Sequence, residues 1–164
     1  MGKHWVVMGV SASGKSVLAR AWAEASGRRL LDGDDFHDGE ALARMTAVQA
    51  LTESQRAPWL NRLVDALRQS PEPCVLAASL LKRAHRQLLR EALPGLRFAH
   101  LQLSLDLARQ RCAARRQHFF PAALVESQFA ALEDTAGEPD VMPLDAALPI
   151  GALLQQLRRL GDSP

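Results

Sequence analysis

The sequence predicts an α/β fold in which a parallel sheet lies between two layers of helices. Three observations predict it. Short apolar, β-branched runs alternate along the chain with longer segments rich in helix formers, as in parallel sheets. A glycine-rich loop at residues 9–16 joins the first strand-like run to the first helical one. Strong turn signals separate the later segments, without an internal repeat or a low-complexity stretch.

The expected strands are short, apolar and bounded by turn residues. Pro143 stands inside the last of them. Because proline has no N–H to donate to a neighbouring strand, it predicts that this strand lies at an edge of the sheet. The strands are expected at residues 4–8, 29–31, 74–78, 98–103 and 141–142.

The expected helices carry recognisable end signals. Gly27 is placed to cap the first helix, and Thr52 and Gln55 form a capping-box pattern at the start of the third. Pro58 predicts either a kink in that third helix or a main helical segment that begins at the proline. The helices are expected at residues 16–26, 40–45, 52–69, 82–92, 104–116 and 121–132, with one more at the C-terminus. The side chains of this last helix that share one face, and should pack on the sheet, are Ile150, Leu153, Leu154, Leu157 and Leu160.

The composition indicates one domain over residues 1–164, with an ordinary apolar fraction of 48%. The net charge of +2, with acids and bases interspersed, argues against a nucleic-acid partner. No apolar run approaches the roughly 20 residues of a membrane span, so we expect no membrane partner. Cys74 and Cys112 lack metal-ligand spacing, and strand-like sequence begins at residue 4. We therefore expect reduced thiols, no signal peptide and a cytoplasmic location.

Residues 9–16 match the phosphate-binding pattern G-x-x-x-x-G-K-[ST] at every fixed position. Glycines let the backbone wrap a phosphate, and the N–H groups at a helix N-terminus attract it. Lys15 is expected to reach the β- and γ-phosphates, and the Ser16 hydroxyl to hold Mg²⁺. Ala12 stands where many such loops have a third glycine. If that position is left-handed, alanine costs roughly 1–2 kcal/mol there.

The segment Asp32-Gly33-Asp34 follows the second strand at its carboxyl end, where open α/β sheets bind ligands. Its two carboxylates could orient an acceptor hydroxyl or bind Mg²⁺ through water; the alternative is a solvated turn with a helix cap. Arg56 suits an anionic substrate group, unless it is a surface arginine beside a core Trp59. Lys82 follows the third strand on the same rim.

Arg111 and Arg115 are spaced to share one face of a helix. Like charges on one face repel unless an anion lies between them, so we expect these arginines to close over a triphosphate from a lid. The alternative is a solvated basic face. His37 and His118 belong to no metal-ligand pattern, and each is expected to be a hydrogen-bonded structural histidine.

Together, these motifs resemble the gluconokinase family over nearly the whole chain, in order and at family spacing. They are the phosphate loop, Asp32-Gly33-Asp34-x-x-His37, Met45, Arg56-x-Pro58-Trp59-Leu60, Ser79-x-x-Lys82, Leu89-Arg90, Arg111-x-x-x-Arg115-x-x-His118-Phe119, Ser127-Gln128-Phe129 and Leu132-Glu133.

The resemblance implies a three-layer, shikimate-kinase-like phosphate-loop kinase fold, with a five-stranded parallel sheet and a helical lid at about residues 112–125. It also implies transfer of the ATP γ-phosphoryl group to the 6-hydroxyl of D-gluconate, with Mg²⁺ as cofactor, by a homodimer. The ATP-binding residues it implies are Gly9, Val10, Ser11, Ala12, Ser13, Gly14, Lys15, Ser16, Arg111 and Arg115. The acceptor-side residues it implies are Asp34, His37, Arg56, Lys82 and His118.

Within this resemblance, the residues expected to be catalytic are Lys15, Asp34 and Arg115. The residues expected to hold Mg²⁺, directly or through water, are Ser16 and Asp32. Departures from the family pattern gather on the acceptor side. They are Ala41 where the family has an asparagine, Val48-Gln49-Ala50 where it has Gly-x-Pro, the acidic pair that here reads Glu53 and Gln55, and Leu80 where it has an alanine. They leave two alternatives open: a kinase of the same fold for another sugar acid or small hydroxyl compound, and a non-catalytic nucleotide-binding module.

Overall fold

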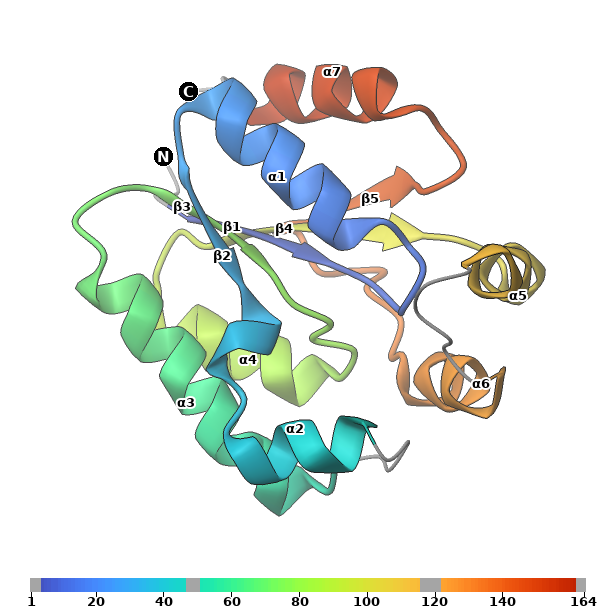
Figure 1. The fold of residues 1–164 in the computed structure, drawn as a ribbon. Coiled ribbons are helices and arrows are strands. Elements are labelled where there is room, and N and C mark those ends of the chain that lie inside the picture. The colour runs from blue at the N-terminus through green and yellow to red at the C-terminus, as the bar shows by residue number, and fades with distance from the viewer. Residues whose placement is uncertain (1–3, 47–50, 116–121, 162–164) are drawn as a thin grey trace.

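The computed structural model describes residues 4–46, 51–115 and 122–161. In Figure 1 they form one five-stranded sheet with helices on both faces, which confirms the predicted three-layer arrangement. The sheet is parallel throughout and has the strand order β2-β3-β1-β4-β5. The strands are β1 (Trp5–Met8), β2 (Arg29–Asp32), β3 (Cys74–Ala77), β4 (Arg97–Gln102) and β5 (Val141–Asp145). The helices are α1 (Lys15–Ser26), the short 3₁₀ helix η1 (Gly33–Phe36), α2 (Gly39–Thr46), α3 (Glu53–Gln69), α4 (Arg83–Ala92), α5 (Leu105–Ala114), α6 (Ala122–Ala131) and α7 (Ile150–Gly161).

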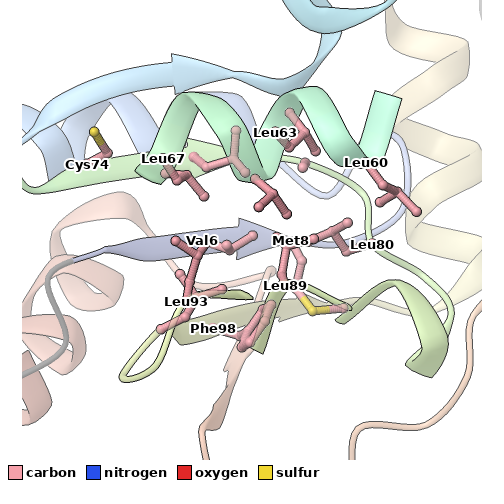
Figure 2. Packing of buried hydrophobic residues seen from close by; sticks show 14 of the residues in the cluster. Val6, Met8, Leu60, Leu63, Leu67, Cys74, Leu80, Leu89, Leu93 and Phe98 are labelled. Atoms are coloured by element: carbon pink, nitrogen blue, oxygen red, sulfur yellow. The ribbon is translucent and has the colours of Figure 1, made fainter. Parts of the chain in front are cut away.

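The central strand β1 is buried on both faces, and its side chains alternate between two cores. Val6 and Met8 belong to the core that α3 and α4 cover, and Figure 2 shows leucines of α3 pointing toward them. Trp5 and Val7 belong to the opposite core, under α1 and α7. This alternation follows from the two-residue period of a strand, and it fixes which helices cover which face.

The C-terminal elements largely follow the sequence prediction. β5 is an edge strand, as Pro143 predicts, and Pro143 pairs opposite His100 with its side chain exposed. In α7, Leu153 and Leu157 are buried against the sheet. Leu160, which was expected on the same buried face, is 45% exposed because it lies in the last turn of the helix.

The helix-end signals are confirmed in two places. Gly27 ends α1 in the left-handed conformation, and Thr52 and Gln55 form both hydrogen bonds of a capping box at the start of α3. Because α3 begins at Glu53 and continues through Pro58, the alternative that its main segment begins at the proline is wrong.

The carboxyl ends of β1, β2 and β3 bring three loops to one edge of the sheet. After β2 the chain turns at once into η1, and Gly33 makes this turn possible. A Cβ at Gly33 would lie 2.8 Å from the carbonyl oxygen of Ala77, at the end of β3. Trp59 of α3 fastens the turn, because its indole N–H donates to the carbonyl of Gly33 at 2.7 Å. Among the described residues, no helix has the length and apolar character that a membrane span requires.

Truncation in the core under α3 should test this packing. Leu63 is fully buried in that core, so we expect Leu63→Ala to lower the free energy of unfolding by about 2–5 kcal/mol. Urea unfolding followed by circular dichroism measures the change, with Leu160→Ala as the matched exposed control. Equal stability losses in the two variants would contradict the packing described here.

Candidate active site

The loop at residues 9–16 leaves β1, turns back and opens α1. Gly14 is the N-cap of α1, with φ of 90°, and no side chain caps this helix. Gly9 has φ of 154°, and a Cβ there would lie 2.9 Å from the carbonyl oxygen of Leu101 and 2.8 Å from the hydroxyl of Ser13. Backbone N–H groups at an uncapped helix N-terminus are the donors that a phosphate requires.

Ala12 adopts the left-handed conformation, with φ of 65°, as the sequence analysis considered. The structure shows what the side chain does at this position. The methyl group is buried in a small core with Ala108 and Cys112 of α5 and Val125 of α6. Burial of this methyl group opposes the backbone cost of roughly 1–2 kcal/mol and ties the loop to these two helices.

Lys15 lies where the loop meets the carboxylates at the end of β2. Its partial burial lowers the pKa of its ammonium group, while the negative charge of Asp34, and then that of Asp32, raises it. Arg115 acts in the same direction as burial, so its guanidinium lies within electrostatic range of Lys15. These four residues thus place two positive charges and two carboxylates beside the phosphate loop.

Asp32 and Asp34 have different surroundings. The carboxylate of Asp32 accepts a hydrogen bond from the backbone N–H of Asp34 at 3.0 Å and caps η1. The helix-cap alternative is therefore confirmed for Asp32, although a capping carboxylate keeps a second oxygen for a ligand. Asp34 is exposed and lines a cavity beyond the loop.

This cavity, of about 330 Å³, lies between η1, α3, α4 and α6. The titratable side chains that line it are Asp34, His37, Glu53, Arg56, Lys82 and His85. The structure therefore brings together the acceptor-side residues that the sequence analysis singled out, except His118, which lies outside the described residues. Of the departures from the family pattern, Glu53 and Leu80 line the cavity, whereas Ala41 and Gln55 do not, and residues 48–50 are not described.

Glu53 gathers the basic residues of the cavity around one carboxylate. Lys82 and His85 lie 2.9 Å from its oxygens, and Arg56 lies 3.2 Å away. Hydrogen bonds from His85 and then Lys82 lower the pKa of Glu53 to about 2, so it is ionised at neutral pH. Glu53 and His85 were not predicted as site residues. For Glu53 a signal was available, because its spacing of three residues from Arg56 on a helix predicts an ion pair between them.

His37 forms a wall of the cavity. Its ring stacks on that of Trp59, with centroids 4.7 Å apart and an angle of 7° between the planes. Burial lowers the pKa of His37, and the charge of Asp34 opposes the shift. Trp59 is a core residue, as expected, and it holds the histidine face-on beside Asp34.

Lys82 is placed by a buried charge network that the sequence did not reveal. Arg86 is fully buried and donates to the carbonyls of Leu80 and Leu81, each at 3.0 Å, just before Lys82. It also forms two hydrogen bonds with Glu138 through its Nε and one through its Nη2. Leu80 has φ of 44°, and these bonds hold the peptide groups around that strained residue.

Arg111 and Arg115 do not share a helix face as predicted. α5 ends at Ala114, and the extended backbone of Arg115 lies beyond the helix. Arg111 instead braces the phosphate loop, donating to the carbonyls of Ala12 at 3.2 Å and Ser13 at 3.3 Å. It also donates to the carbonyl of Ala146, after β5, at 2.6 Å. The lid stays a prediction, because residues 116–121 lie outside the described ranges.

The fold and the phosphate loop define a phosphate-loop phosphotransferase. Residues 5–139 match the protein family described as AAA domain, and the chain belongs to it. A shikimate kinase from Bacteroides thetaiotaomicron shares the fold, with a TM-score of 0.69 at 14% identity over 98% of each chain.

More specific relatives narrow the class. The chain is 34% identical to the thermosensitive gluconokinase of Escherichia coli K12 over 162 residues, covering 96% of this chain and 87% of that protein. The crystal structure of a gluconokinase from Sinorhizobium meliloti 1021 superposes with a TM-score of 0.89 at 39% identity, covering 96% of this chain and 92% of that one. The chain belongs to the gluconokinase family, as the sequence motifs indicated.

The buried network behind Lys82 generates a prediction about acid stability. Hydrogen bonds from Arg86 and Arg90 outweigh the effect of burial and lower the pKa of Glu138 to about 2, below its ordinary value of 4.5. The stability that this carboxylate provides is complete above pH 4.5 and is lost as the pH falls toward 2. Glu138→Gln should cost about 3 kcal/mol at pH 7 and should flatten the decline in stability between pH 5 and pH 2.

Urea unfolding at a series of pH values measures both effects, with Glu24→Gln on the exposed side of α1 as the control. A Glu138→Gln variant whose stability falls with acid as steeply as that of the parent would contradict the assignment.

Proposed function

We propose that this protein phosphorylates D-gluconate with ATP to give 6-phospho-D-gluconate and ADP. The observation that carries the proposal is the arrangement of the cavity, which has a carboxylate near the phosphate loop and basic side chains elsewhere on its wall. Asp34 acts electrostatically on Lys15, and Arg56 and Lys82 meet at Glu53. A sugar acid has the matching groups, since it carries a hydroxyl at one end and a carboxylate at the other. Membership of the gluconokinase family supports this choice of acceptor.

In the proposed reaction, the 6-hydroxyl oxygen of the acceptor attacks the γ-phosphorus of ATP. The bond from that phosphorus to the β–γ bridging oxygen breaks, and ADP leaves. Asp34 orients the hydroxyl and accepts its proton. Lys15, the backbone N–H groups of the loop and Arg115 stabilise the charge on the phosphoryl oxygens. Since this transition state is loose, positioning and charge contribute more than a strong base.

Arg56 and Lys82 bind the carboxylate of the acceptor in this proposal. The guanidinium of Arg56 offers five N–H donors and the ammonium of Lys82 three, so each keeps donors beyond those that Glu53 uses. Glu53 holds the two cations in place and offsets one of their charges. His37 provides a flat wall on which the carbon chain can lie.

Mg²⁺ fits the residues at the phosphate loop, and we propose Ser16 and Asp32 as the residues that hold it, Asp32 through water. Both offer the hard oxygen donors that this ion prefers, Ser16 is exposed, and Asp32 lies close enough to Lys15 to influence its pKa. When bound, the ion would neutralise charge on the β- and γ-phosphates. We also propose a cytoplasmic homodimer, on the family resemblance, and light scattering of the purified protein tests the assembly.

Leu80 favours a second candidate acceptor. This residue lines the cavity and replaces a smaller alanine of the family pattern, so it narrows the space for a substrate. A different sugar acid or small hydroxyl compound would then be the preferred acceptor. Comparison of kcat/KM over a panel of sugar acids and shikimate decides between the candidates, and gluconate as the best acceptor would exclude the second.

The first test is a coupled assay of ADP release with Mg-ATP, with and without D-gluconate. We expect turnover that depends on gluconate, and we expect Lys15→Ala to remove nearly all of it while the circular dichroism spectrum stays unchanged. Absence of turnover at millimolar gluconate would defeat the proposal. A Lys15→Ala variant of parental activity would overturn the role of the phosphate loop.

Truncation of Arg56, which is proposed to bind the acceptor carboxylate, should weaken the binding of gluconate and leave the binding of ATP unchanged. Arg56→Ala is expected to raise the gluconate KM by about tenfold to a hundredfold, as for one lost charged hydrogen bond, with the ATP KM unchanged. Steady-state kinetics in each substrate measure this, and Arg68→Ala on the far end of α3 is the control. An unchanged gluconate KM would make Arg56 a surface arginine.

A further inference from the structure

Gln128 of α6 lies where the phosphate loop meets the acceptor cavity. Its side-chain oxygen accepts a hydrogen bond from the backbone N–H of Ser11 in the loop, across a separation of 117 residues in the chain. The same side chain lines the cavity with Asp34 and Lys82. One residue therefore contacts both the nucleotide side and the acceptor side of the site.

The position of Gln128 is fixed by the packing of its helix. Val125 is buried, and Phe129 is partly buried, in the small core that contains Ala12 and Cys112. Gln128 lies three residues after Val125 and one before Phe129, so it emerges beside the side of α6 that faces the loop. In Figure 1, α6 lies next to α5 on the side of the sheet where the loop before α1 emerges.

The side-chain amide of Gln128 keeps hydrogen-bond donors that can face the cavity. A glutamine side chain has one oxygen that accepts and one nitrogen with two N–H donors. Because the Ser11 N–H can only donate, the oxygen must face the loop. The nitrogen is then a donor at the cavity, and no hydrogen bond from it occurs within the described residues.

A reacting hydroxyl needs such a donor. The carboxylate oxygens of Asp34 accept hydrogen bonds, so a hydroxyl that donates to Asp34 keeps its own oxygen lone pairs available. An N–H donor on a second wall of the cavity would fix the direction of those lone pairs. The correct direction places one of them on the γ-phosphorus.

We propose that Gln128 is an acceptor-binding residue that joins the two halves of the site. Its Nε2 donates to a hydroxyl oxygen of the sugar acid while its Oε1 stays on the Ser11 N–H. The acceptor is thereby positioned from the same backbone that binds the phosphates. This inference rests on the proposed function for the identity of the acceptor.

Two substitutions separate the donor from the acceptor of the carboxamide. Gln128→Glu keeps an oxygen for the Ser11 N–H and removes the donor; Gln128→Met keeps the length and removes both. We expect each variant to raise the gluconate KM by about threefold to tenfold, as for one neutral hydrogen bond. The ATP KM should stay at the parental value in Gln128→Met, which adds no charge beside the phosphates. Gln87→Met is the matched control, because Gln87 is on the exposed side of α4 and contacts Glu91.

The outcomes are distinct. A parental gluconate KM in Gln128→Glu would mean that Gln128 only fastens the loop, and it would overturn the inference. So would a Gln128→Met variant in which the ATP KM alone rises. Thermal unfolding of each variant excludes a misfolded protein, and calorimetric titration of gluconate in the presence of ADP measures acceptor binding without turnover.

Failure of the proposed function gives a different result. It appears in the parent, as absence of gluconate-dependent ADP release. In that case the same variants are compared on the best acceptor of the sugar-acid panel. A KM for that acceptor that rises in both variants supports the inference, and an unchanged one overturns it.

Discussion

The backbone conformation of the phosphate loop is the constraint on which the rest of the site depends. The loop can bind an anion only if its carbonyl groups point away from the ligand and its N–H groups point toward it. Arg111 supports this orientation by drawing the carbonyls of Ala12 and Ser13 to one side. Since the peptide unit is planar and trans, the N–H of Gly14 then points the opposite way from the carbonyl of Ser13. The bond from Arg111 to the carbonyl of Ala146 extends this support to the far edge of the sheet.

The acceptor cavity is organised by a different principle, the pairing of charges across separate elements. Glu53 begins α3, Lys82 precedes α4 and His85 lies in the first turn of α4, yet Lys82 and His85 both contact the Glu53 carboxylate. Behind them, Arg86 fixes the peptide groups of Leu80 and Leu81. A site that must bind an anion beside another anion gains from such rigidity, because the cations need not rearrange when the substrate arrives.

Much of the fold could be predicted because its signals are local. The alternation of β1 between two cores, the cap at Gly27 and the edge position of Pro143 each follow from the residues at those positions. The candidate site was predicted where a motif has fixed spacing, as at Lys15. Contacts between distant segments left no such trace, and so the joint role of Glu53 and His85, and the buried bonds of Arg86, emerged only from the structure. The sequence pattern placed Arg115 on the same helix face as Arg111, and this prediction was wrong because α5 ends at Ala114.

Ala12 has a mechanical consequence. Its methyl group belongs both to the loop and to the small core of α5 and α6, where Val125 is buried and Phe129 packs alongside. Sliding α6 away from the loop would return these apolar surfaces to water at about 25 cal/mol per Å². Small displacements are therefore resisted by the hydrophobic effect, and α5 and α6 should move together with the loop as one rigid body. Any hinge that opens the nucleotide site must then lie outside this small core.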